Sequence, residues 1–91
     1  MTNDLAIKEK LCALSLLKCL DENPLSLEEV RKSPRRILSV YSIKQIVYIL
    51  ETFTNYGIVF FEPEGQDRIY YLTSLGKRLV QKVALNSFRN D

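Results

Sequence analysis

The sequence predicts one α+β domain, mostly helical, in which three helices are followed by a two-stranded β-hairpin and a last helix. Its 91 residues suffice for one hydrophobic core but not for two. The chain is 46% hydrophobic and 26% charged, with only three Gly and three Pro, which is the composition of a globular protein. The spacing of apolar residues changes along the chain from helical to strand-like and back, and this order gives the fold class.

The first two helices are predicted from apolar periodicity and capping residues. Apolar residues recur at helical spacing over about residues 4–21, and a second helical region covers about residues 27–39. The second region begins with a capping box, in which Ser26 accepts from a backbone amide and Glu29 reaches back. Pro34 does not fit inside a helix, so we expect a break there.

The second half of the chain predicts a helix, a hairpin and a final helix. A helix over about residues 43–56 starts with another capping box and has a continuous apolar stripe. β-branched and aromatic residues predict a hairpin over residues 58–72, with a five-residue turn at residues 63–67. Thr73 is a suitable N-cap for a last helix over about residues 74–88.

Two spaced motifs flank the hairpin. The first is a helix with four apolar positions, a glycine and two further apolar residues: Ile46, Ile49, Leu50, Phe53, Gly57, Ile58 and Val59. The second is Tyr70-Tyr-Leu72-Thr73-Ser-Leu-Gly76. Together they resemble the recognition helix and the Y-x-L-T-x-x-G pattern of winged helix-turn-helix proteins, including MarR-like and PadR-like regulators. The resemblance spans about two thirds of the chain and implies a winged-helix fold, with the hairpin as the wing.

The residue types argue against an enzyme or a metalloprotein. Without histidine, Cys12 and Cys19 cannot complete a usual zinc site, and two helical turns separate them too widely for an intramolecular disulfide. Gly-rich phosphate loops and nucleophile motifs are also absent from the sequence. We therefore expect no catalysis, metal or cofactor. The two cysteines are interpreted as small buried hydrophobes, or alternatively as an intersubunit disulfide or redox switch.

The sequence has no segment of membrane-spanning length, and charges interrupt the apolar run near its start. We therefore expect a cytoplasmic, nucleoid-associated protein.

Positive charge is concentrated in two segments. Residues 24–44 contain five basic and two acidic residues, and residues 77–91 contain four basic residues and one acidic residue. Residues 45–76, in contrast, contain one basic and four acidic residues. In a helix-turn-helix, the start of the third helix enters the major groove and the preceding helix lies over the backbone. The resemblance therefore implies double-stranded DNA as partner. The expected contacts are Lys32, Arg35, Arg36, Ser42, Lys44, Gln45, Tyr48 and Arg68. The alternative is that these residues form only a solvated face.

The expected wing is acidic at its tip, where Glu62, Glu64 and Asp67 outnumber Arg68. Either the wing stays off the DNA, or Arg68 alone inserts into it. A negative wing could instead face a protein, because like charges disfavour contact with phosphate.

The first helix has a wider apolar face than a three-helix core requires. We expect Ile7, Leu11, Leu14 and Leu17 to face the core. The remaining apolar residues of the first and last helices would then form a homodimer interface, consisting of Leu5, Cys12, Leu16, Cys19, Leu85 and Phe88. The alternative is that the two helices cover these residues within one chain.

The sequence thus predicts a small homodimeric transcriptional regulator. Its two third helices would enter major grooves about one DNA turn, ~34 Å, apart on a pseudo-palindromic site. The alternative is a winged-helix module for protein–protein interaction within a replication, transcription or trafficking assembly.

Overall fold

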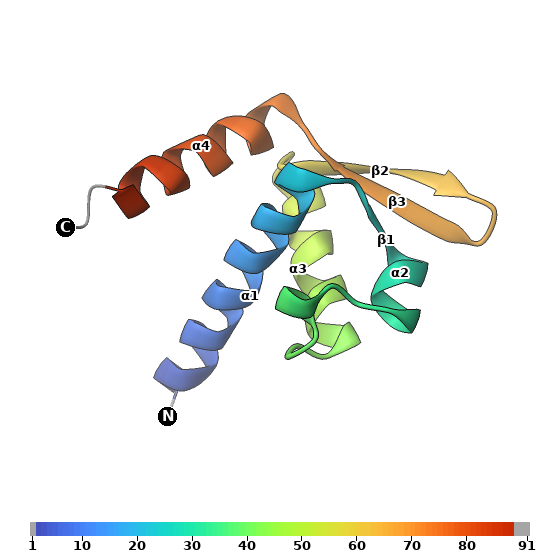
Figure 1. The fold of residues 1–91 in the computed structure, drawn as a ribbon, viewed down its shortest axis with the longest axis horizontal. Helices are drawn as coiled ribbons and strands as arrows, with labels where there is room; N and C mark the ends of the chain where they lie inside the picture. Colours follow the sequence, from blue (N-terminus) through green and yellow to red (C-terminus); the bar gives the residue numbers. More distant parts are fainter. Residues whose placement is uncertain (1, 89–91) are drawn as a thin grey trace.

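A computed structural model describes the backbone of residues 2–88 and the side chains of residues 7–83. As predicted, the chain is α+β and mostly helical (Figure 1). Its elements, in order, are α1 (Thr2–Glu22), β1 (Leu25–Ser26), α2 (Leu27–Lys32), the 3-10 helix η1 (Arg36–Leu38), α3 (Ile43–Asn55), β2 (Val59–Glu64), β3 (Asp67–Leu72) and α4 (Ser74–Phe88). Helices α1 and α4 lie on one side of the molecule, and the hairpin extends to the other side (Figure 1).

The sheet has three antiparallel strands in the order β1-β3-β2, rather than the two strands expected. The additional strand, β1, places Leu25 opposite Tyr70 and Ser26 opposite Ile69. Two residues are too few to show an alternating pattern. This strand is therefore defined by its pairing with β3 and could not be predicted from its own sequence.

The hairpin turn has two residues, Gly65 and Gln66, so the expected five-residue turn was wrong. Glu64 pairs with Asp67, and Pro63 still lies within β2, opposite Arg68. Gly65 has φ +62° whereas Gln66 does not have positive φ, and these signs fit a type II′ turn. Pro63 is tolerated because β2 is at the edge of the sheet. A proline there, which has no amide donor, leaves no hydrogen bond of a neighbouring strand unmade.

The second helical region divides near Pro34. Helix α2 ends at Lys32, and the chain continues through an extended Arg35 (φ −59°, ψ 147°) into η1. Proline lacks an amide donor and restricts the residue before it, which explains why the helix does not continue.

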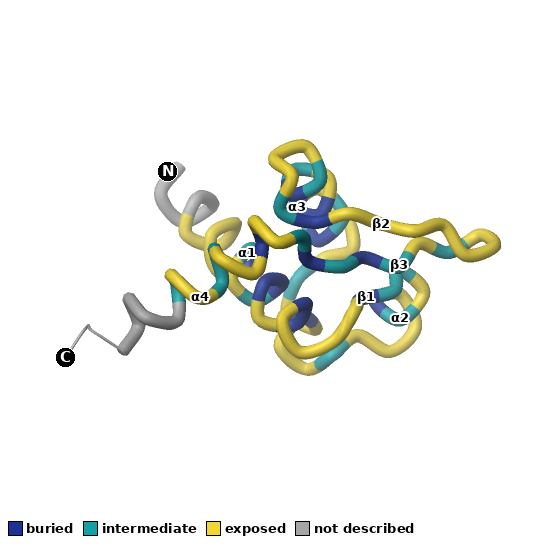
Figure 2. Tube along the Cα trace, turned by 90° about the horizontal axis from the view of Figure 1, so that it is seen from above, coloured by how far each residue is buried: buried dark blue, intermediate teal, exposed yellow. Residues whose placement is uncertain are grey.

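The core lies where α1, α3 and β3 meet, and most of β2 and the hairpin turn are exposed (Figure 2). It also receives apolar side chains from β1, α2 and η1. Its buried residues are Cys12, Leu16, Leu17, Cys19, Leu20, Leu25, Val30, Leu38, Ile46, Ile49, Leu50, Phe53, Val59, Tyr70 and Leu72.

Helix α1 turns the opposite apolar stripe inward from the one expected. Cys12 and Leu16 are 0% exposed and Cys19 is 2% exposed, whereas Ile7 is 56% and Leu11 is 52% exposed. Leu14 is also exposed, and of the expected inward residues only Leu17 is buried. The predicted interface residues Cys12, Leu16 and Cys19 therefore belong to the core and have no surface for a partner. The side chains of Leu5, Leu85 and Phe88 lie outside the described residues.

The two sequence motifs meet at one end of the hairpin. Gly57 ends α3 with φ +74°, and the Ile58 amide donates to Phe53 O (2.8 Å). The Thr73 amide donates to Ile58 O (3.0 Å) and the Thr73 hydroxyl to Gly57 O (2.6 Å), while Thr73 Oγ1 accepts from the Gly76 amide (3.0 Å). A Cβ on Gly76 would lie 2.2 Å from Ile58 O. The glycine is therefore required for the start of α4 to lie this close to the Ile58 backbone, just before β2.

Candidate nucleic-acid interface

Helix α3 is held on the core by one face and presents the opposite face to solvent. Its buried residues are Ile46, Ile49, Leu50 and Phe53. Its exposed residues at helical spacing, here named the α3 stripe, are Lys44, Tyr48, Glu51 and Asn55. Tyr48 is 57% exposed. Because the buried face fixes the helix, the stripe has a defined orientation on the surface.

The start of α3 is capped by Ser42. Its hydroxyl oxygen accepts from the Gln45 amide (3.1 Å), and this satisfies one of the amides that lack a helical partner. Ser42 is exposed and Gln45 is half-buried. Of the predicted contacts within α3, Lys44 and Tyr48 are exposed, whereas Gln45 is partly covered.

Lys32 and Arg36 lie in the segment before α3, and both are exposed. Lys32 Nζ is 3.8 Å from a carboxylate oxygen of Glu28, one helical turn earlier. Such an exposed pair contributes little to stability, typically about 0–1 kcal/mol. These two cations are thus available to an anionic ligand.

Arg35 has a structural role, contrary to its expected place in a DNA contact. Its Nε and Nη2 donate to the Glu29 carboxylate (2.9 and 3.5 Å). Nη1 donates to Cys19 O (2.9 Å) and Nη2 to Pro24 O (2.8 Å). Burial alone would lower the pKa of Arg35, but the hydrogen bond and charge of Glu29, together with a contribution from Cys19, outweigh it and raise the pKa. The guanidinium joins the end of α1 to the α2 segment.

The same contacts correct the capping box expected at the start of α2. Ser26 Oγ accepts from the Glu29 amide (3.2 Å), as expected, but the Glu29 carboxylate pairs with Arg35 instead of reaching back. Helix α2 is therefore tied by Glu29 to the turn that follows it.

Asp67 also has a structural role, although its sequence position places it at an acidic wing tip. Its carboxylate accepts from Ser26 Oγ (2.5 Å), the Glu28 amide (3.0 Å) and the Arg68 amide (2.7 Å). The Ser26 hydrogen bond is the main cause that lowers the pKa of Asp67. Desolvation opposes it, and hydrogen bonds from backbone amides add to it. The negative charge thus lies at the amino end of α2, where the helix dipole favours it.

Arg68 points toward α3 and not beyond the hairpin tip. Its guanidinium carbon lies 4.5 Å from the Phe61 ring centroid, which is a cation–π contact. Both residues line a shallow groove of ≈ 260 Å³ between α3 and the hairpin. The other lining residues are Glu51, Thr54, Asn55 and Tyr70. Any nucleic-acid contact of Arg68 would therefore be made beside α3.

The cysteines and other potential ligands do not form a metal site in the described part of the chain. Burial raises the pKa of the Cys12 thiol, with an added contribution from Glu9. Burial likewise raises the pKa of Cys19, although Arg35 opposes the shift. Both thiols are thus protonated and buried, which favours their interpretation as small core residues.

Among residues 2–88, no helix combines the length and the apolar character that crossing a membrane requires.

No protein-family model, curated protein or solved structure matches this chain. We therefore infer its function from its fold and from the geometry of its surfaces.

Proposed function

We propose that the chain is a winged-helix protein that binds double-stranded DNA through α3. The order helix, strand, helix, helix, hairpin, helix and the strand order β1-β3-β2 support this assignment. In it, α2 to α3 form the helix-turn-helix, η1 lies in the turn, and β2 and β3 form the wing. Residues 43–48 then provide the part of the recognition helix that enters the major groove.

The observation that carries the proposal is the pair Lys44 and Tyr48 on the first two turns of a helix packed firmly on its other side. Lysine donates to guanine acceptors, and tyrosine offers an apolar ring to the thymine methyl group and a hydroxyl to phosphate. Arg36 and Lys32 lie in the preceding segment, where a helix-turn-helix contacts the DNA backbone.

The remaining stripe residues suggest which part of α3 contacts DNA. Glu51 lies three residues beyond Tyr48 and is exposed, and a carboxylate repels phosphate. Its favourable contact with a base is acceptance from the cytosine amino group. We therefore assign phosphate contacts to the start of α3 and expect little help from Glu62 and Glu64 on the hairpin.

Binding to a random duplex library at two salt concentrations tests this proposal. Affinity should fall steeply with salt, with a log-log slope of roughly one unit for each phosphate contacted. Selection from the library should return a preferred motif that changes in Tyr48→Ala. Lys44→Ala should weaken duplex binding. Lys10→Ala is its matched control, because Lys10 is also exposed but lies on α1, away from α3. If the wild-type protein does not bind duplex DNA at low salt, the proposal is wrong.

The proposed regulator is a homodimer, and the exposed stripe Ile7, Leu11 and Leu14 on α1 is the surface that supports this. Three large aliphatic residues on successive turns form an apolar face opposite the core.

Sedimentation velocity at micromolar concentration tests the dimer. We expect Leu11→Asp to sediment as a monomer, because a charge would be buried in the apolar contact. Val40→Asp is the control, since Val40 is 71% exposed and lies outside α1. A wild-type protein that is monomeric at tens of micromolar would remove the dimer and leave DNA binding by α3 as a separate question.

The alternative function, a protein-interaction module, is compatible with DNA binding because the hairpin has two faces. One faces α3 and the core, while the other carries exposed aromatic and acidic residues.

A further inference from the structure

The hairpin has an outer face on the side opposite to α3. Phe60 pairs with Tyr71 and Glu62 pairs with Ile69. Because side chains alternate along a strand, these four lie on the side opposite to Phe61 and Tyr70, which line the groove beside α3. We name Phe60, Glu62, Ile69 and Tyr71 the outer hairpin face.

An aromatic pair dominates this face. The rings of Phe60 and Tyr71 are stacked, with centroids 5.1 Å apart and planes inclined by 15°. Phe60 remains 44% exposed although it is a large apolar residue. The pair thus offers a flat aromatic surface to a ligand, and a planar cation is the group that such a surface attracts most strongly.

Carboxylates lie beside the aromatic pair. Glu62 and Glu64 follow Phe60 on the same side of β2, and both are exposed. Burial is the main cause that raises the pKa of Tyr71, and hydrogen bonding and charge from Glu62 add to it. Glu62 is also the diagonal cross-strand neighbour of Tyr71 on the same face, so its side chain lies beside the stacked pair.

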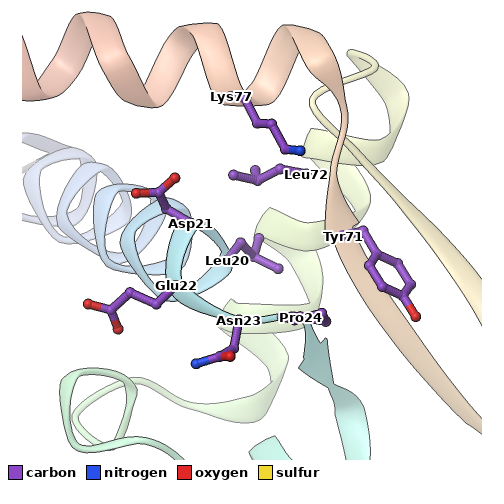
Figure 3. Close-up of a pocket in the computed structure, with 8 residues that line it drawn as sticks. All are labelled: Leu20, Asp21, Glu22, Asn23, Pro24, Tyr71, Leu72 and Lys77. Atoms are coloured by element: carbon purple, nitrogen blue, oxygen red, sulfur yellow. The ribbon is translucent and has the colours of Figure 1, made fainter.

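Tyr71 also borders a hollow of ≈ 210 Å³ (Figure 3). The end of α1, the segment before β1, β3 and α4 form its wall. The lining residues are Leu20, Asp21, Glu22, Asn23, Pro24, Tyr71, Leu72 and Lys77. Two acidic residues and one lysine lie here among apolar side chains. The hollow thus extends the aromatic surface with space for the aliphatic part of a long side chain.

We propose that the outer hairpin face binds an arginine-containing segment of a partner protein. One guanidinium stacks on Phe60 and donates to the Glu62 carboxylate. A second basic side chain of the same segment lies at the hollow beside Tyr71, where the two acidic lining residues Asp21 and Glu22 outnumber Lys77. Arginine fits better than lysine because its planar group stacks on a ring and donates two parallel hydrogen bonds to a carboxylate.

This site is distinct from the proposed DNA interface. The outer hairpin face and the groove beside α3 are on opposite sides of the sheet, so both ligands could be bound together. Loss of one activity should therefore leave the other, and each proposal can fail independently.

Titration of the full chain with three labelled peptides tests the site. The peptides have the same length and the same glycine-serine spacers, and carry three arginines, three lysines or three citrullines. We expect the arginine peptide to bind more tightly than the lysine peptide and the citrulline peptide to bind least. Amide shifts in the 15N-labelled protein should be largest at residues 60–62, 69–71 and 21–23.

Two variants and two matched controls decide the assignment. Phe60→Ser and Glu62→Gln should each weaken arginine-peptide binding about fivefold, as expected for loss of one exposed cation–π or charged contact. Tyr56→Ser and Glu9→Gln remove an exposed aromatic ring and an exposed carboxylate elsewhere, and should leave binding unchanged. Duplex binding should be retained in Phe60→Ser.

Three results would overturn the proposal: no binding of the arginine peptide at millimolar concentration, equal binding of the lysine peptide, or equal affinity in Phe60→Ser and wild type. Peptide binding without any duplex binding would instead support this inference and refute the proposed DNA function.

Discussion

Basic residues lie both at the start of η1 and at the start of α3, but they have different roles. Arg35, the N-cap of η1, donates hydrogen bonds to Glu29, Cys19 O and Pro24 O. Its neighbour Arg36, like Lys44 at the start of α3, is exposed. The charge of a segment is therefore larger than the charge it can offer to a ligand, because hydrogen bonds within the chain engage some of its basic side chains.

The acidic residues of the hairpin divide in the same way. Asp67 accepts hydrogen bonds at the amino end of α2, whereas its cross-strand neighbour Glu64 is exposed. Of two carboxylates opposite each other at the hairpin tip, one thus stabilises the fold and the other faces solvent.

The largest expected effect is on stability, from Arg35→Ala. This change should lower the free energy of unfolding by about 2 kcal/mol, because it leaves Glu29 and two carbonyl groups without their donors. Partial exposure of the pair keeps the effect below that of a fully buried ion pair. Urea denaturation monitored by circular dichroism measures it.

Arg36→Ala is the control for Arg35→Ala and should change stability by less than about 0.5 kcal/mol. Arg35→Lys should remain destabilised, since an ammonium group cannot serve the same three partners at once. Equal stability of Arg35→Ala and Arg36→Ala would show that the two arginines do not differ as the contacts indicate.

The next effect is on binding, from the double variant Arg36→Ala and Lys44→Ala. If both cations contact phosphate, the log-log salt dependence of duplex affinity should become less steep by about two units. Fluorescence anisotropy with one duplex at several salt concentrations measures the slope. An unchanged slope would place the phosphate contacts elsewhere, for example on the basic residues of α4.

The smallest expected effect concerns Asp67 and pH. The pKa of Asp67 is lower in the folded than in the unfolded state. The stability that ionised Asp67 contributes is therefore complete above its unfolded pKa of about 4, and it is lost as the pH falls through the lower pKa of the folded state. Between about pH 4 and pH 2, wild type should therefore lose stability more steeply than Asp67→Asn. Thermal unfolding across this range provides the measurement, and parallel curves would contradict the hydrogen-bonded role of Asp67.

Much of the local structure could be predicted because it depends on short-range patterns. The break near Pro34 follows from a missing donor, and the cap at Ser42 from a side chain that reaches the Gln45 amide. The apolar spacing of α3 similarly identified its buried face, so the exposed positions Lys44 and Tyr48 could be named in advance.

The rest could not be predicted because it depends on residues distant in sequence. Asp67 accepts from Ser26, 41 positions earlier, and Arg35 donates to Cys19 O, 16 positions earlier. Neither contact leaves a spacing pattern. The sequence suggested that an acidic wing could face a protein, but the aromatic pair on the outer hairpin face could not be predicted. The expected turn was too long, and only the register places Phe60 opposite Tyr71.

Helix α1 marks the limit of what the sequence determined. By itself, the sequence determined that this segment is a helix with two apolar stripes, since helical periodicity is a local property. Only the tertiary structure decided which stripe is buried. Cys12 and Leu16 lie in the core while Ile7 and Leu11 face solvent, because the choice depends on which stripe packs in the core formed with α3 and β3. Burial depends on the elements that pack against a helix, so two apolar stripes of similar size cannot be told apart by their sequence alone.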